Sequence, residues 1–99
     1  MNFNKSIKIS DSIFSQEIDG EMVLLDREST NYFGLDTVGS TIWKIAQESS
    51  NLEEIYRKLI DIYDVSAEIL EKDLANFINQ LEQNNIIEVE DIETKTTTR

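Results

Sequence analysis

Residues 21–48 read EMVLLDRESTNYFGLDTVGSTIWKIAQE, and within this stretch the chain changes from strand to helix. Residues 21–25 are mainly apolar, residues 26–29 are a polar connection, and residues 31–35 carry aromatic side chains that favour a pleated, half-buried surface. Over residues 37–48 apolar side chains recur at helical spacing. The stretch therefore predicts two strands followed by a helix.

The segment before it adds another strand. Residues 7–10 alternate apolar and polar side chains, and residues 13–18 read as a looser continuation of the same strand. Asp19-Gly20 is a hairpin turn signal, because glycine readily takes the positive φ that such turns require. Three neighbouring strands with short connections predict an antiparallel meander.

Two more helices follow, over residues 52–63 and 67–84, and Asn84-Asn85 can end the last one because asparagine tolerates the left-handed conformation. Short polar side chains stand where each helix begins. The predicted N-caps are Asp36 or Thr37, then Asn51 with Glu54 as its capping-box partner, then Ser66. The predicted apolar stripes are Val38, Ile42, Ile45 and Ala46, with Trp43 beside them, in the first helix, and Leu70, Leu74, Phe77, Ile78 and Leu81 in the third.

These elements predict one domain over residues 1–89, with a short final strand at 86–89 and a polar, disordered tail at 90–99. The expected fold class is α+β, with an N-terminal three-stranded antiparallel sheet followed by a three-helix bundle. Three helices with β elements at their flanks form a winged-helix-like arrangement.

Composition excludes much chemistry. The 99 residues include 20 acidic and 9 basic side chains, no cysteine and no histidine, for a net charge of −11. Thiol and imidazole nucleophiles, bases and metal ligands are therefore missing, and we expect no catalysis, no metal and no cofactor. Without an apolar run of about 20 residues or a signal core, we expect no membrane partner and a cytoplasmic location.

Charge also argues against DNA, the first partner that a winged-helix shape suggests. The presumed recognition helix, residues 67–84, sums to −3 and has a single lysine and no arginine. A helix that reads a groove needs basic side chains for phosphates and bases. We therefore expect no nucleic-acid partner, and a protein- or peptide-binding module instead.

In the predicted meander, the strand at residues 31–35 pairs with only one other strand, so its other side can be open. It lacks lysine and proline, which usually block such edges, and carries Tyr32, Phe33 and Leu35. A peptide could add there as a further strand. Alternatively, these aromatic and apolar side chains simply fill the core between sheet and helices.

An ordered series of residues resembles the PqqD-like family. The series comprises Leu24-Leu25-Asp26, Tyr32-Phe33-Gly34-Leu35, Val38-Gly39, Ile42-Trp43, Tyr63-Asp64-Val65, Asp73-Leu74, Phe77-Ile78, Leu81 and Asn85-Ile86-Ile87. The resemblance implies a RiPP recognition element, which binds the leader of a ribosomally made precursor peptide and delivers it to a modifying enzyme. In that family the leader adds to the third strand of the sheet and packs against the third helix.

Carried over by position, the resemblance implies peptide-binding residues in two elements. Alternation predicts that Tyr32 and Gly34 share one face of the strand, and Phe33 and Leu35 the other. The candidates are Asn31, Tyr32, Phe33, Gly34 and Leu35 from the strand, and Leu70, Asp73, Leu74, Phe77 and Ile78 from the third helix.

One departure concerns the turn before that strand. Thr30 stands where the family often has glycine, and because threonine disfavours positive φ we expect a different turn type. The resemblance is compatible with radical-SAM pathways and with lasso-peptide pathways, in which the partner is a leader peptidase; we favour a lasso-type system. The alternative is an acidic scaffold or dimerisation module that binds no leader, and an exposed edge can also form a homodimer.

Overall fold

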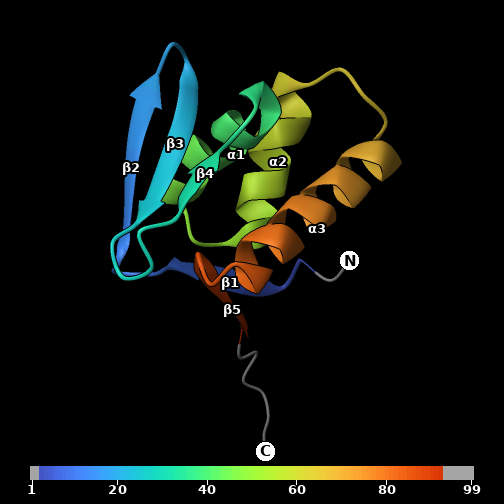
Figure 1. Ribbon diagram of the computed structural model, residues 1–99. Helices are drawn as coiled ribbons and strands as arrows, with labels where there is room; N and C mark the ends of the chain where they lie inside the picture. Colours follow the sequence, from blue (N-terminus) through green and yellow to red (C-terminus); the bar gives the residue numbers. More distant parts are fainter. Residues whose placement is uncertain (1–2, 93–99) are drawn as a thin grey trace, which may run out of the picture.

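The computed structural model describes residues 3–92, which form five strands and three helices (Figure 1). None of the helices in this part of the chain is both long and apolar enough to cross a membrane. In chain order the elements are β1 (Lys5–Ile9), β2 (Ile13–Ile18), β3 (Glu21–Asp26), β4 (Tyr32–Gly34), α1 (Thr37–Glu48), α2 (Leu52–Ile62), α3 (Ala67–Gln83) and β5 (Ile87–Asp91).

The predicted antiparallel meander is confirmed as the sheet β2-β3-β4. Leu24 at its centre pairs with Ser15 of β2 and Phe33 of β4. The hairpin between β2 and β3 turns at Asp19 and Gly20, with φ of 54° and 85°. The meander leaves β4 at one edge of the sheet.

The expected single strand over residues 7–18 was wrong. A turn at Ser10–Ser12 divides it, where the Ile13 N–H donates to the Ser10 carbonyl at 3.1 Å. β1 then leaves the meander and pairs antiparallel with β5, with Ile7 opposite Val89. That partner lies far along the chain, so the local alternation carried no sign of it.

The helix boundaries follow their predicted caps. Asp36, rather than Thr37, caps α1 and accepts from the Gly39 N–H at 2.7 Å. Asn51 accepts from the Glu54 N–H, and Ser66 from the Ile69 N–H. After α3, Asn85 takes the predicted left-handed conformation with φ of 61°, whereas Asn84, the other residue of the predicted stop, has φ of −94°.

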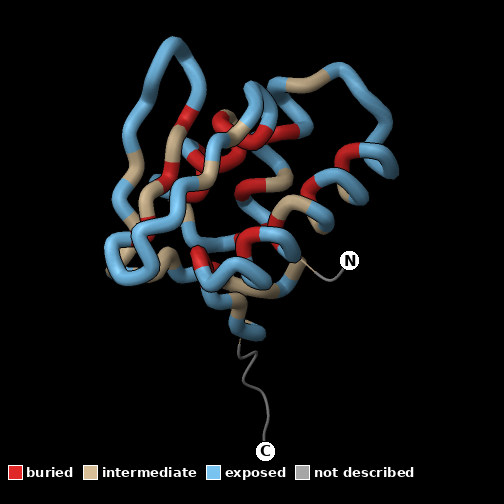
Figure 2. The backbone as a smooth tube through the Cα atoms, in the orientation of Figure 1, coloured by how far each residue is buried: buried red, intermediate tan, exposed pale blue. Residues whose placement is uncertain are grey.

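The core lies where the helices face one side of the meander (Figure 2). One prediction about α1 needs correction. Trp43, expected beside the stripe, is 1% exposed and lies in the core, whereas Val38 is 42% exposed and does not belong to the buried stripe. The largest fully buried side chains of the core are Leu24, Ile42, Trp43, Leu52, Ile55, Leu59, Leu74 and Ile86.

The turn before β4 departs from expectation, because Thr30 adopts φ of 61° despite its branched Cβ. The Asp26 carboxylate organises this turn by accepting hydrogen bonds from the Glu28 N–H and the Ser29 hydroxyl, each at 3.0 Å. These bonds, and the backbone bond from the Thr30 N–H to the Asp26 carbonyl, hold the strained residue in place.

The final strand reaches past its predicted end at Val89. β5 continues to Asp91, which forms an ion pair with Lys5 of β1. The rest of the predicted tail, residues 93–99, lies outside the described residues.

Candidate functional site

β4 presents unpaired backbone groups at the open edge of the meander. The Asn31 carbonyl accepts from the Asp26 N–H, and the Leu35 N–H donates to the Met22 carbonyl, each at 2.9 Å. These groups point toward β3, and backbone direction alternates along an antiparallel pair. The N–H and C=O groups of Tyr32 and Gly34 therefore point away from β3, where no described strand pairs with them.

Side chains along β4 alternate as predicted. Tyr32 is 71% exposed and Gly34 is exposed, whereas Phe33 and Leu35 are half-buried and pack against the core. The core-filling alternative thus describes Phe33 and Leu35, while Tyr32 and the open backbone edge remain accessible.

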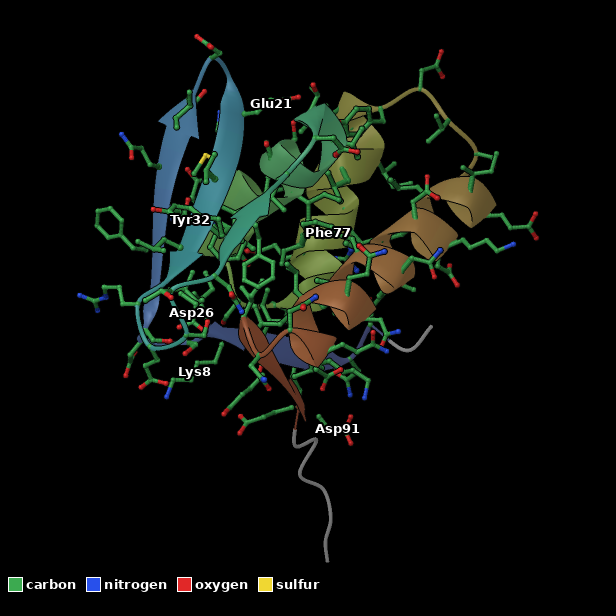
Figure 3. All side chains as sticks on the ribbon, viewed as in Figure 1. Lys8, Glu21, Asp26, Tyr32, Phe77 and Asp91 are labelled. Atoms are coloured by element: carbon green, nitrogen blue, oxygen red, sulfur yellow. The ribbon has the colours of Figure 1, made fainter. Side chains whose placement is uncertain are left out.

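A groove of about 300 Å³ lies next to the end of β4, between the first turns of α1 and the face of α3. Figure 3 shows Phe77 in this region, between α3 and the sheet. The groove is lined by Asp36, Val38, Gly39, Ile42, Asp73, Asn76, Phe77 and Gln80.

The structure separates the α3 residues that the resemblance grouped together. Asp73 and Phe77 line the groove. Leu70, Leu74 and Ile78 are instead 4%, 0% and 3% exposed, belong to the core and do not line the groove. Their role in peptide binding is not supported by this geometry, and we assign them to the support of the helix.

Helix phase explains the division. Asp73, Asn76, Phe77 and Gln80 recur every three or four residues and so share a face, with Phe77 next to the core stripe. Sequence reasoning missed Asn76 and Gln80, which their spacing from Asp73 could have indicated. It also missed Asp36, Val38, Gly39 and Ile42 as lining residues, because only the packing of α1 against α3 brings them there.

Ser40 ties the α1 wall of the groove to the sheet. Its hydroxyl accepts from the Met22 N–H at 2.8 Å and donates to the Leu35 carbonyl at 3.4 Å. Because Ser40 is 2% exposed, these bonds are shielded from water. The first turn of α1 is thereby fixed next to β4.

The chemistry of the groove suits binding of a peptide segment. It joins apolar surface from Val38 and Phe77 to two carboxylates, Asp36 and Asp73, and none of its lining residues is basic. Across residues 3–92, no three acidic side chains lie close enough together to hold a metal ion. Open backbone groups and an adjoining apolar groove are the two parts needed for strand addition.

Comparison with known proteins gives a family and two structural neighbours. The family model for coenzyme PQQ synthesis protein D (PqqD) matches residues 21–87. A structure described as TbiB1 in complex with the TbiA(beta) leader peptide is 37% identical, covers 91% of this chain and 99% of that chain, and gives a TM-score of 0.77. No curated protein matches the chain.

The second neighbour is described as lasso peptide synthetase B1 complexed with the leader peptide. It is 23% identical, covers 84% of this chain and 98% of that chain, and gives a TM-score of 0.75. At that identity it shows a shared fold. Both similarities extend over nearly the whole described chain.

Proposed function

Because the chain belongs to the PqqD family, we propose that it is a RiPP recognition element that binds the leader segment of a ribosomally made precursor peptide. The observation that carries the proposal is the open edge of β4 beside the groove of α1 and α3. The two structural neighbours, each described with a leader peptide, support it.

The leader would add as a strand next to β4. Its backbone would pair with the outward N–H and C=O groups of Tyr32 and Gly34, and its inward side chains would lie in the groove against Phe77 and Val38. A disordered leader must become ordered on binding, which offsets part of the interaction energy. We expect a Kd of roughly micromolar to tens of nanomolar, about −8 to −10 kcal/mol.

The role is binding, and the chemistry belongs to a partner. The bound leader would be presented to a modifying enzyme or leader peptidase. The description of one neighbour as a lasso peptide synthetase B1 supports a lasso-type pathway over a radical-SAM one. The precursor itself would be encoded by a short reading frame near the gene.

The test is a titration of fluorescently labelled leader peptides, taken from such reading frames and compared with the TbiA(beta) leader, followed by anisotropy. Saturable binding at micromolar concentration or below is expected for one leader. Phe77→Asp should abolish it, because a charge would replace the apolar groove wall. Val38→Asp should weaken binding, and because Val38 is 42% exposed and not part of the core, the variant should fold.

The matched control is Ile62→Asp, which adds the same charge at an exposed apolar residue that does not line the groove. It should leave the affinity unchanged. Circular dichroism checks that every variant is folded. If no leader binds the folded wild-type protein, the proposal fails and the scaffold alternative takes its place.

A further inference from the structure

The face of α3 that lines the groove offers a leader more than one kind of contact. Phe77 supplies an apolar surface, and Asp73, one turn earlier, supplies an exposed carboxylate. One more turn toward the N-terminus, Ile69 is 55% exposed. Residues four apart lie near one another on a helix surface, so Ile69, which does not line the groove, continues the row of Phe77 and Asp73 beyond it, and the row reads apolar, acidic, apolar.

The spacing of this face matches an extended peptide. Four residues of helix advance by about 6 Å. In an extended strand, side chains on the same side recur every second residue, about 6.6 Å apart. A leader that runs along α3 would therefore bring successive inward side chains to Phe77, Asp73 and Ile69 in turn.

The charge around Asp73 determines which leader side chain is favoured opposite it. The Asp36 carboxylate on the opposite wall is engaged as the α1 cap, with Oδ1 accepting from the Gly39 N–H at 2.7 Å. Asp73 has no such bond among the described residues, and no basic residue lines the groove. A leader side chain placed between these two carboxylates meets negative charge on both walls.

We propose that the groove selects leaders with the pattern apolar–x–cationic–x–apolar, in which a lysine or arginine faces Asp73. This inference rests on the proposed function, since it assumes that the leader adds to β4. The pattern reads the same in both chain directions, so it does not depend on how the leader is oriented. Asp73 is thereby the residue that sets specificity, while Phe77 and Ile69 receive the flanking apolar side chains.

The test uses the leader that binds in the titration described above, synthesised with Lys and then Glu at each position in turn. Dissociation constants are measured with the wild-type protein, Asp73→Lys and Glu68→Lys. Glu68 is the matched control, because it is an exposed acidic residue of α3 outside the groove. Its replacement changes the net charge by the same amount.

At one leader position we expect Lys to bind the wild-type protein several-fold tighter than Glu, roughly fivefold for a pair that is partly exposed. Asp73→Lys should invert the preference at that position alone, and Glu68→Lys should leave it unchanged. A leader that binds with no such position, or with a preference unaltered by Asp73→Lys, overturns this inference and leaves the proposed function intact. If no leader binds at all, both are overturned.

Discussion

Phe77 of α3 lies directly against Gly39 of α1, so that a Cβ built on Gly39 would come within 3.0 Å of Phe77 Cε1. The same Cβ would stand 3.2 Å from Asp36 Oδ1 and 3.5 Å from Leu35 Cβ. The end of β4, the cap of α1 and the aromatic wall of the groove therefore all pack closely around Gly39. Glycine at this position sets how deeply the Phe77 ring can sit.

Gly39→Ala should therefore displace the Phe77 ring and lower leader affinity by roughly tenfold. The free energy of unfolding should change by less than about 1 kcal/mol, because alanine favours helix by about 1 kcal/mol over glycine while the tight contact opposes it. Urea unfolding and anisotropy measure the two effects. Thr41→Ala, on the same helix but outside the groove, should leave the leader affinity unchanged. If Gly39→Ala binds the leader with unaltered affinity, the position of the Phe77 ring does not contribute to leader binding.

Thr30→Gly should stabilise the protein. Thr30 has φ of 61°, a conformation that costs a branched residue about 1–2 kcal/mol, and glycine adopts it at no steric cost. After the greater chain entropy of glycine is subtracted, we expect a gain of roughly 0.5–1 kcal/mol, seen as a higher urea midpoint with an unchanged m-value. Asn85→Gly, also at φ of 61°, should gain less, because asparagine tolerates this region. A lower urea midpoint for Thr30→Gly than for the wild-type protein would contradict the claim that the Thr30 backbone is strained.

Asp26 should make the stability of the β3–β4 turn depend on pH. The Glu28 N–H has the largest effect and lowers the pKa of the Asp26 carboxyl below its ordinary value of 3.8; desolvation, the next largest effect, opposes it, and hydrogen bonds from Ser12 and Ser29 add to the lowering. A lowered folded pKa stabilises the fold above the ordinary value, and this contribution is lost as pH falls through the folded pKa. The stability advantage of wild type over Asp26→Asn should therefore be constant near neutral pH and shrink below 3.8. Urea unfolding of both proteins across that pH range measures this difference in the free energy of unfolding. A difference that grows as the pH falls would contradict a lowered pKa for Asp26.

Tyr32→Pro should block leader binding without unfolding the sheet. The Tyr32 N–H points to the open edge, so proline removes a donor that the leader would use and that β3 does not. Leader affinity should fall at least tenfold while the far-UV circular dichroism spectrum is retained. Phe33→Pro, whose N–H faces β3, should instead destabilise the sheet. Full affinity in a folded Tyr32→Pro variant would show that binding uses the groove alone.

Local signals were sufficient for the helices and for the antiparallel order of the meander, but not for the turn that separates β1 from β2. Asp36, Asn51 and Ser66 each accept a hydrogen bond from the N–H three residues later, as short polar caps do. Alternation along β4 also predicted that Tyr32 and Gly34 share one face and that Phe33 and Leu35 share the other, although the structure was needed to show which face meets the core. These features depend on residues within one or two turns of each other, so a single sequence contains them.

Features that depend on packing between distant segments could not be predicted from the sequence. Pairing of β1 with β5 joins the two ends of the domain, and no local pattern specifies that register. Similarly, the apolar stripe of α3 identified Leu70, Leu74 and Ile78 as important without saying whether they face the core or a ligand. Only the position of α1 shows that the groove lies over Asp73, Asn76, Phe77 and Gln80.

The central claim is that the leader pairs with the outward backbone of β4, and amide hydrogen exchange followed by NMR tests it most directly. In the free protein the Leu35 amide, bonded to the Met22 carbonyl, should exchange slowly, and the amides of Tyr32 and Gly34 should exchange fast. On saturation with leader, Tyr32 and Gly34 should become protected by roughly tenfold or more. Saturable binding that leaves both amides unprotected would contradict strand addition at β4.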